Sequence, residues 1–393
     1  MSFDLARARA ETPGCSNVLH FNNAGASLMP EPVLNSVIGH LRLESEIGGY
    51  EAAEQAQQEL EHVYGAASRL IGCRRDEIAV IENATRAWDM AFYSITFRPG
   101  DTILTFVAEY ASNFIAYLQV ANRTGAIIKV IPNDEYGAIS MDALTNSIDN
   151  RVKLIALTHV PTNGGLVNPA EKVGDIAKQA GVLYLLDACQ SVGQMPIDVQ
   201  RIGCDMLSAT GRKFLRGPRG TGFLYVRSEI LERLVPPLLD LHAARWVEKD
   251  RYEIREDARR FENWESNCAG KIGLGTAIDY ALQWGLETTW SRVFHLGAQL
   301  RERLAGLTGV AVRDLGREKC GIVTFTVEGK RPEEIRSALS EKRINVSVSP
   351  AQYTLMDMEN RGLKDGVIRA SVHYYNTEEE IDRFCHVLER FFV

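Results

Sequence analysis

Short runs of apolar and β-branched residues alternate with longer stretches of helical periodicity through the first half of the chain. Runs of about four to eight such residues, bounded by turn residues, are typical of buried strands. Strands with helices between them form a parallel sheet that helices cover on both faces. The pattern therefore predicts an α/β fold with a largely parallel, doubly wound sheet. Its predicted strands span residues 77–81, 102–107, 126–131, 153–160, 182–187, 204–209 and 222–226.

The pattern changes after Arg227. Residues 228–265 are charged and irregular, which favours a connection with an exposed part that faces a second subunit. A long helix is predicted from Gly270 to Trp284, and strands and helices then follow to a final helix. A chain of 393 residues suits two domains. The predicted division is an N-terminal segment (1–50), a large cofactor-binding domain (51–265) and a smaller α+β domain (266–393).

The composition excludes several classes of protein. A net charge of −7 argues against a role in binding nucleic acid or a membrane surface. No apolar run approaches the roughly 20 residues of a membrane span, and the N-terminus lacks the apolar core of a secretory signal. The seven cysteines are scattered, without C-x-x-C or zinc-finger spacing, and no dinucleotide or P-loop glycine motif is present. We therefore expect a cytoplasmic protein that acts on a small molecule.

The most informative stretch runs from Val182 to Val226. An apolar strand ends on Asp187, a second short strand follows, and Lys213 comes after it in a loop rich in glycine and arginine. Both residues therefore lie where strands end, which is the edge at which open α/β sheets bind ligands. A carboxylate can hold a cationic ring nitrogen, and a lysine can form an imine with an aldehyde. Pyridoxal phosphate needs both from a protein.

This stretch resembles the class V aminotransferase and cysteine desulfurase branch of the fold-type I pyridoxal-phosphate enzymes. The similarity extends from FNNAGAS near the start of the chain to IRASVHYYNTEEEIDRF near its end. The resemblance implies pyridoxal 5'-phosphate as cofactor and an amino acid as substrate. It also implies a homodimer with its active site near the subunit interface, and an N-terminal segment that packs on the small domain.

Lys213 aligns with the lysine that forms the Schiff base in this family. The resemblance implies that it also removes the α-proton of the substrate. Its amine must be desolvated or lie beside other cations to react at neutral pH, and we expect Arg212 and Arg216 to supply that charge. The alternative is that these residues form a solvated basic loop.

Asp187 and Gln190 match the D-x-x-Q motif of the family. The resemblance places Asp187 on the pyridine nitrogen, whose protonation makes the ring an electron sink, and Gln190 on the phenolic oxygen. Tyr110 takes the position of the ring-stacking histidine. A tyrosine can also stack on the ring, but it is a weaker acid than imidazolium. The structural alternatives are a helix-capping aspartate and a core tyrosine.

A helix N-terminus with hydroxyl groups nearby is a phosphate site. Ala84 and Thr85 begin a predicted helix and match the threonine-bearing loop of the family. Thr210 and Arg212 match its hydroxyl residue and histidine before the lysine, and a guanidinium also binds phosphate. Residues 265–267 align with the contact to the partner subunit's phosphate, although Glu265 replaces the family's threonine. Thr85 could instead be an ordinary capping residue.

Arg369 matches the arginine that binds the substrate carboxylate in the family, and a guanidinium suits that group. Asn23 in FNNAGAS and Tyr50 after a glycine pair are predicted to contact substrate by the same resemblance. Thr162 and Asn163 align near the family's asparagine beside the cofactor oxygen, with an offset of one residue.

The segment 347–366 lacks the catalytic cysteine that desulfurases of this family carry before the arginine strand, and Cys320 and Cys385 lie in other elements. We therefore expect β-elimination across a C–S bond of a cysteine-derived substrate, as in members similar to hercynylcysteine sulfoxide lyase. Transamination, or epimerisation as in members similar to isopenicillin epimerase, is the main alternative. A cofactor-holding scaffold without catalysis is a hypothesis of another class.

Overall fold

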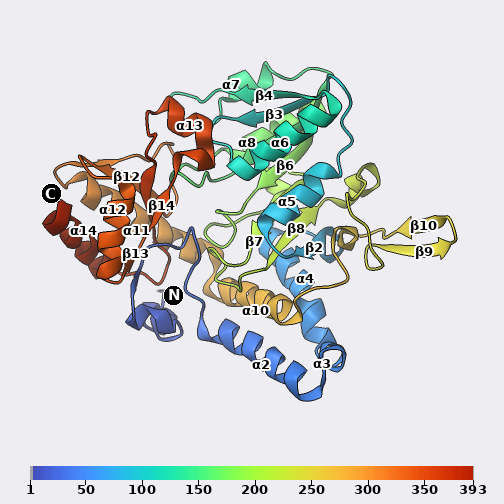
Figure 1. The fold of residues 1–393 in the computed structure, drawn as a ribbon, viewed down its shortest axis with the longest axis horizontal. Coiled ribbons are helices and arrows are strands. Elements are labelled where there is room, and N and C mark those ends of the chain that lie inside the picture. The colour runs from blue at the N-terminus through green and yellow to red at the C-terminus, as the bar shows by residue number, and fades with distance from the viewer. Residues whose placement is uncertain (1–2, 393) are drawn as a thin grey trace.

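The computed structural model describes residues 3–392. Within them the larger sheet has seven strands, and each begins and ends within two residues of its predicted bounds (Figure 1). The strands are β2 (Ile78–Ile81), β3 (Thr102–Phe106), β4 (Ile127–Ile131), β5 (Val152–Thr158), β6 (Leu183–Asp187), β7 (Met206–Thr210) and β8 (Gly222–Val226). The predicted α/β fold is confirmed.

The strand order is β2-β8-β7-β6-β5-β3-β4. β8 is antiparallel to both of its neighbours, and the pairs from β7 to β4 are parallel. The carboxyl ends of β3, β5, β6 and β7 therefore meet at one edge of the sheet. A ligand site is expected at that edge, because polar loops leave the strands there.

Helices bury an apolar stripe against each face of this sheet, as helical periodicity requires. One face is covered by α4 (Gln57–Ile71), α8 (Ala170–Ala180) and α10 (Cys268–Trp284), whose buried side chains form one core cluster with the strands. The other face is covered by α5 (Ala84–Tyr93) and α6 (Ala111–Thr124). Strands covered on both faces are apolar along their whole length, which explains the continuous apolar runs of the sequence.

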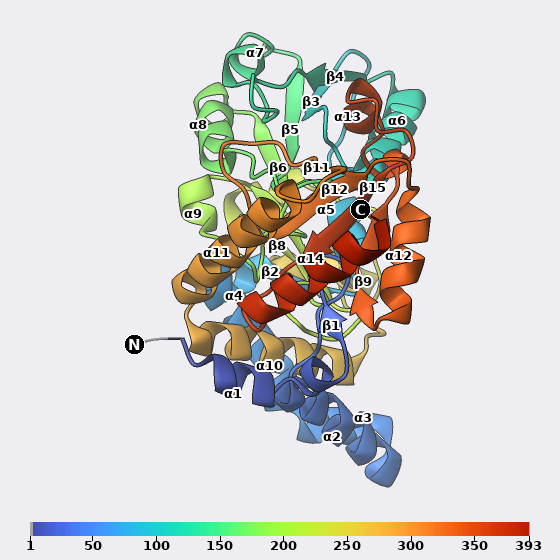
Figure 2. The same ribbon diagram turned by 90° about the vertical axis from the view of Figure 1, so that its left-hand side faces the viewer.

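A smaller sheet, antiparallel throughout, lies to one side of the large one in Figure 1 and in front of it in Figure 2. Its order is β11-β12-β15-β14, and helices α11, α12 and α14 share its core. Arg369 lies on β15, one of its two inner strands. The bounds are β11 (Val310–Val312), β12 (Ile322–Val327), β14 (Ser347–Ser349), β15 (Val367–Ser371), α11 (Leu286–Ala305), α12 (Pro332–Glu341) and α14 (Glu378–Phe392).

The N-terminal segment joins this smaller unit through β1 (Leu19–His20), which pairs in parallel with β13 (Ile344–Asn345). The chain then continues as α2 (Glu31–Ile47), which packs along α10. The helix α10 also packs on α4, so it contacts the large sheet's own helices. The domain boundaries at residues 50 and 265 stay a prediction.

Two peripheral elements extend from the body of the molecule. A hairpin of β9 (Ala244–Glu248) and β10 (Arg251–Ile254) projects from the large sheet's side, and α3 (Gly49–Gln55) lies at the far end of α2 (Figure 1). None of the helices in residues 3–392 is long and apolar enough to cross a membrane. The remaining helices are α1 (Leu5–Ala10), α7 (Met141–Thr145), α9 (Val199–Ile202) and α13 (Leu355–Asn360).

Candidate active site

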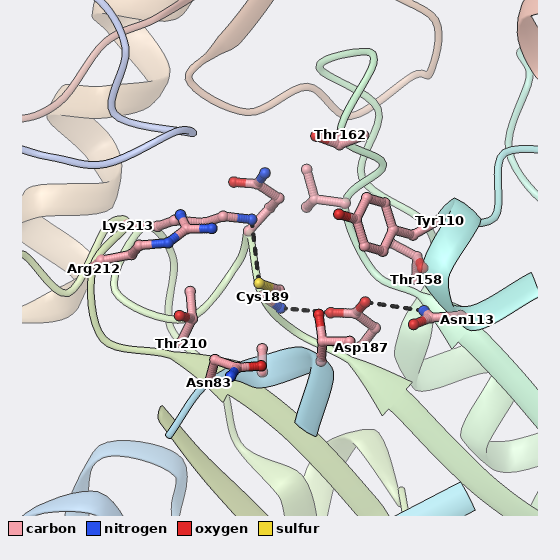
Figure 3. A pocket seen from close by; sticks show the side chains of 14 residues that line it. Asn83, Tyr110, Asn113, Thr158, Thr162, Asp187, Cys189, Thr210, Arg212 and Lys213 are labelled. Carbon is pink, nitrogen blue, oxygen red and sulfur yellow. Dashed lines mark hydrogen bonds between the residues drawn. The ribbon is translucent and has the colours of Figure 1, made fainter. Parts of the chain in front are cut away.

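A cavity with an empty volume of about 690 Å³ opens at the carboxyl edge of the large sheet (Figure 3). Most residues predicted from the sequence to bind the cofactor line it, and they come from loops far apart in the chain. The lining residues are Asn83, Ala84, Thr85, Tyr110, Asn113, Thr158, Val160, Thr162, Asp187, Cys189, Gln190, Thr210, Arg212 and Lys213.

Lys213 extends into this cavity from the loop after β7. Its Nζ lies 3.2 Å from the Sγ of Cys189. Burial lowers the pKa of Lys213 below its ordinary value, and the positive charges of Arg212 and Arg369 lower it further, while Cys189 opposes the shift. A lowered pKa leaves more of the amine neutral and nucleophilic at neutral pH.

The prediction that the charge of Arg216 helps to activate Lys213 is wrong. Its guanidinium turns away toward the N-terminal segment and donates to the backbone oxygen of Leu28 and the hydroxyls of Thr12 and Tyr374. The second cation near Lys213 is instead Arg369 from the smaller sheet, which sequence order alone does not place there.

Asp187 ends β6 on the floor of the cavity, and both of its carboxylate oxygens accept hydrogen bonds. Oδ1 accepts from the backbone N–H of Cys189 at 2.9 Å, and Oδ2 accepts from Asn113 Nδ2 at 3.1 Å. Burial raises the pKa of Asp187, whereas these two donors and the charge of Lys213 lower it. A cationic ring nitrogen in the cavity would favour the ionised carboxylate further.

Behind Asp187 lies a second buried carboxylate, Glu109. It accepts hydrogen bonds from the hydroxyls of Thr105 and Tyr117 and from Thr158 Oγ1 at 2.5 Å. The side-chain amide of Asn113 donates to Glu109 at 3.0 Å as well as to Asp187. One amide therefore fixes the positions of two carboxylates relative to each other.

Tyr110 stands across the cavity from Lys213, at the N-terminus of α6 (Figure 3). Burial raises its pKa, so the phenol is neutral over the physiological range. Gln190 donates from Nε2 to the backbone oxygen of Ala24, while its Oε1 has no partner among the described residues. A buried polar atom without a partner is one that a bound ligand can satisfy.

The other end of the cavity has the features of an anion site. Asn83 caps α5 by accepting from the backbone N–H of Arg86 at 2.9 Å, and Asn83, Ala84 and Thr85 line the cavity at this helix N-terminus. Thr210 and Arg212 line the same cavity, and Arg212 Nη1 also donates to the backbone oxygen of Gly25. Helix N–H groups, hydroxyls and a cation together suit a phosphate.

Arg369 approaches from β15 and connects the smaller sheet to the cavity. Its Nη1 donates to the backbone oxygen and the hydroxyl of Thr162, at 3.1 and 2.6 Å, and its Nε donates to Ser347 Oγ. No carboxylate of residues 3–392 forms an ion pair with it, and burial lowers its pKa to about 10. Asn163, next to Thr162, bonds with Ser349 across the same junction.

Three predicted groups lie away from this cavity, whereas Arg369 and Asn163 lie beside its lining residue Thr162 without lining it themselves. Asn23 is buried and bonds with Ser371 and Tyr375, and Tyr50 lies on α3 with 80% of its surface exposed. Glu265, Ser266 and Asn267 line a neighbouring hollow with Lys271. Their predicted contacts with substrate or with a partner's phosphate stay predictions.

Five lining residues were not singled out from the sequence, namely Asn83, Asn113, Thr158, Val160 and Cys189. Cys189 lies inside the D-x-x-Q motif, Asn113 follows Tyr110 by three residues, and Asn83 precedes the predicted helix. The last could have been found, because asparagine before a helix is a common cap. Cys189 and Asn113 acquire their contacts only through the fold.

Comparison with known proteins identifies the family. The model of the class V aminotransferases matches residues 19–384. The chain therefore belongs to the class V aminotransferase family. The pyridoxal-phosphate cofactor predicted from the sequence is the cofactor of this family, and the lining residues fit it: a lysine, a facing carboxylate, an aromatic ring and an anion site share one cavity.

The relatives carry related names. A probable cysteine desulfurase of Methanothermobacter thermautotrophicus is 28% identical over 97% of this chain and 96% of its own. A probable cysteine desulfurase of Xylella fastidiosa is 30% identical over 94% of this chain and 90% of its own. Among solved structures, a cysteine desulfurase from Thermococcus onnurineus has a TM-score of 0.92 and 28% identity, with coverage of 100% and 98%. The cystine C–S lyase C-DES, bound to its product cysteine persulfide, has a TM-score of 0.87 at 24% identity, covering 97% and 99%, and shows the same fold.

Proposed function

We propose that this protein is a pyridoxal-phosphate-dependent C–S lyase that performs β-elimination on a cysteine-derived amino acid. The observation that carries the proposal is the arrangement of Lys213 and Asp187, which face one cavity between an anion site and Arg369. The names of relatives and structural neighbours, which include cysteine desulfurases and a cystine C–S lyase, support a sulfur-containing substrate.

Each residue has a defined role in this proposal. When bound, pyridoxal phosphate supplies an aldehyde that condenses with amines and a protonated ring that accepts an electron pair. Asp187 holds the ring nitrogen, and the α5 N-terminus with Thr210 and Arg212 holds the phosphate. Arg369 binds the α-carboxylate of the substrate. Lys213 holds the cofactor at rest and then acts as the base, because its pKa is lowered.

The elimination balances without an oxidant. Lys213 takes the α-proton, the C–S bond at the β-carbon breaks, and the sulfur leaves as a thiolate that takes up a proton. Water then hydrolyses the unsaturated amine that remains. The products are a thiol, pyruvate and ammonia.

The segment before β15 favours elimination, because a desulfurase of this family needs a catalytic cysteine there. The segment 347–366 contains no cysteine, and Cys320 and Cys385 are buried in the core of other elements. A desulfurase remains a second candidate on one observation. Cys189 lines the cavity 3.2 Å from Lys213 and could accept sulfur from the substrate, which would release alanine instead of pyruvate.

The test is a product assay on the purified protein with S-substituted cysteines, their sulfoxides and common L- and D-amino acids. We expect pyruvate and ammonia in equal amounts, together with an equal amount of a thiol from an S-substituted cysteine or of a sulfenic acid from its sulfoxide. Borohydride reduction should fix the cofactor on Lys213. Lys213→Ala should lower turnover at least about a hundredfold, whereas Lys172→Ala, on the exposed face of α8, should not. Formation of alanine would indicate a desulfurase, a keto acid with aminated cofactor would indicate a transaminase, and a D-amino acid would indicate an epimerase; each result would contradict the lyase assignment. A colourless protein would contradict the cofactor assignment.

We further infer a homodimer that works in a reducing cytoplasm. Large apolar side chains are exposed on α2, α3 and the β9–β10 hairpin, including Leu41, Tyr50 and Trp246, and the exposed fractions of the last two are 80% and 78%. Contact with a second subunit would remove such side chains from water, which favours association. All seven cysteines lie in the described chain and are free, as expected where thiols stay reduced.

Sedimentation analysis tests the dimer. The wild-type protein should sediment with twice the mass of one chain, and the double variant Leu41→Glu with Trp246→Glu should shift toward the monomer, because buried charge is costly. Phe294→Glu, an exposed position on α11, serves as the matched control. A wild-type monomer at micromolar concentration would contradict the inference.

A further inference from the structure

A cluster of potential metal ligands lies between α2 and α10, outside the cavity described above. His40 and Glu44 are four residues apart on α2, so they share one face of that helix. Cys268 is the first residue of α10, which packs along α2. The ligand atoms of these three side chains all lie within 4.8 Å of one another.

His40 gives the second, independent observation. Its side chain is buried, with 5% of the residue exposed, although histidine is polar. Its Nε2 lies 3.1 Å from Glu44 Oε1 but forms no hydrogen bond with any described residue. A buried ring nitrogen without a hydrogen bond costs free energy unless another group satisfies it. The nitrogen is aimed at the space that Glu44 and Cys268 also face.

The chemistry of the three ligands selects the ion. An imidazole nitrogen, a carboxylate oxygen and a sulfur form the mixed set that Zn²⁺ accepts, whereas Mg²⁺ and Ca²⁺ prefer oxygen alone. Zinc bonds of about 2.0–2.3 Å place tetrahedral ligand atoms about 3.3–3.7 Å apart. His40 Nε2 and Glu44 Oε1 are 3.1 Å apart, slightly closer than that spacing, and the three ligand atoms lie within 4.8 Å of one another, so small side-chain shifts are needed to bind an ion.

We propose that His40, Glu44 and Cys268 bind one Zn²⁺ ion with tetrahedral geometry, with water in the fourth position. The ion joins α2 to the N-terminus of α10. Cys268 ligates as the thiolate, because a coordinating zinc ion removes the thiol proton. Binding therefore releases a proton and weakens as pH falls.

The test uses the full-length protein with its cofactor, treated with a chelator and then titrated with Zn²⁺ alone. We expect one ion per chain, competing with a chromophoric chelator of micromolar affinity. His40→Ala and Cys268→Ser should each weaken Zn²⁺ binding by more than about tenfold. Mutation of a residue that only hydrogen-bonds to a metal ligand already causes a loss of about that size. His62→Ala and Cys73→Ser are matched controls outside the cluster, and both should bind as wild type.

A second measurement separates ligation from a folding defect. Co²⁺ in the wild-type protein should give tetrahedral d–d bands at wavelengths longer than the cofactor absorbs, and Cys268→Ser should lose intensity while its circular dichroism stays unchanged. Zn²⁺ should also raise the melting temperature of wild type but not of that variant. Absence of stoichiometric Zn²⁺ binding, or binding that both variants retain, would overturn the proposal.

Discussion

Asn113 is the residue on which the electrostatics of the cavity depend. It donates one N–H to Asp187 and the other to Glu109, and both carboxylates are buried. Without this amide, Asp187 and Glu109 would each lose one hydrogen-bond donor. Repulsion between their negative charges would then favour protonation of one of the two. Protonated Asp187 would no longer stabilise a cationic ring nitrogen. Asn113 is thus a positioning residue for Asp187.

Replacement of Asn113 by leucine tests this role. A hydrogen bond to a charged group contributes about 1.5–3 kcal/mol, so we expect cofactor affinity to fall at least about tenfold. The absorption of the bound cofactor should also titrate at a different pH, which loss of packing alone would not cause. Absorption titrations and cofactor dissociation measure both effects. Asn122→Leu, exposed on the same helix, is the control, and an unchanged pH profile in Asn113→Leu would refute the assignment.

At the scale of elements, the loop between β7 and β8 links the sheets to the N-terminal segment through Arg216. This guanidinium is buried, donates to Thr12, Leu28 and Tyr374, and lies 4.5 Å from the ring centroid of Tyr375. Aromatic faces and oxygen acceptors surround its charge, and no carboxylate of the described chain pairs with it. The flat fork of an arginine can satisfy all these partners at once.

Lysine cannot replace this fork, although it keeps the charge. Arg216→Lys should lower the free energy of unfolding by about 2–4 kcal/mol, because at least two buried acceptors lose their donor. Urea titrations followed by circular dichroism measure the change. Arg219→Lys, exposed in the same loop, should leave stability within about 0.5 kcal/mol of wild type. Equal stabilities of the two variants would show that Arg216 is not a structural link.

At the scale of the whole molecule, buried histidines couple stability to pH. His20, His159 and His373 are all buried, and burial lowers the pKa of each. For His159 burial is the sole cause, and its pKa falls to about 4. Between that value and the ordinary pKa near 6.5, the unfolded chain binds a proton that the folded protein does not. Stability is therefore lost as pH falls through this window.

His159→Gln should reduce this loss. Each pH unit in the window is worth about 1.4 kcal/mol for one group, so the variant should lose about 2 kcal/mol less than wild type between pH 7 and pH 5. Unfolding in urea at the two pH values measures the difference. His386→Gln, exposed on α14, should lose as much stability as wild type. A variant at position 159 with the full loss would contradict the argument.

Most of the fold and part of the site follow from short-range pattern. The apolar runs give the seven large-sheet strands within two residues, because strands buried on both faces leave little room for polar side chains. Asp187, Lys213 and Thr85 are found because they come directly after strands or at a helix start. Asn113 and Cys189 were not predicted as site residues, because nothing in the local sequence distinguishes them from ordinary helix and loop residues.

The sequence by itself determined which residues lie at the edge of the sheet where ligands bind, because strand periodicity and turn residues are local properties of the chain. Only the tertiary structure decided which distant side chains share a space. It turned Arg216 away from Lys213 and brought Arg369 near instead, and it placed His40 and Glu44 beside Cys268. Such neighbours depend on the packing of whole helices and sheets, and this packing sums many weak contacts that no short stretch of sequence contains.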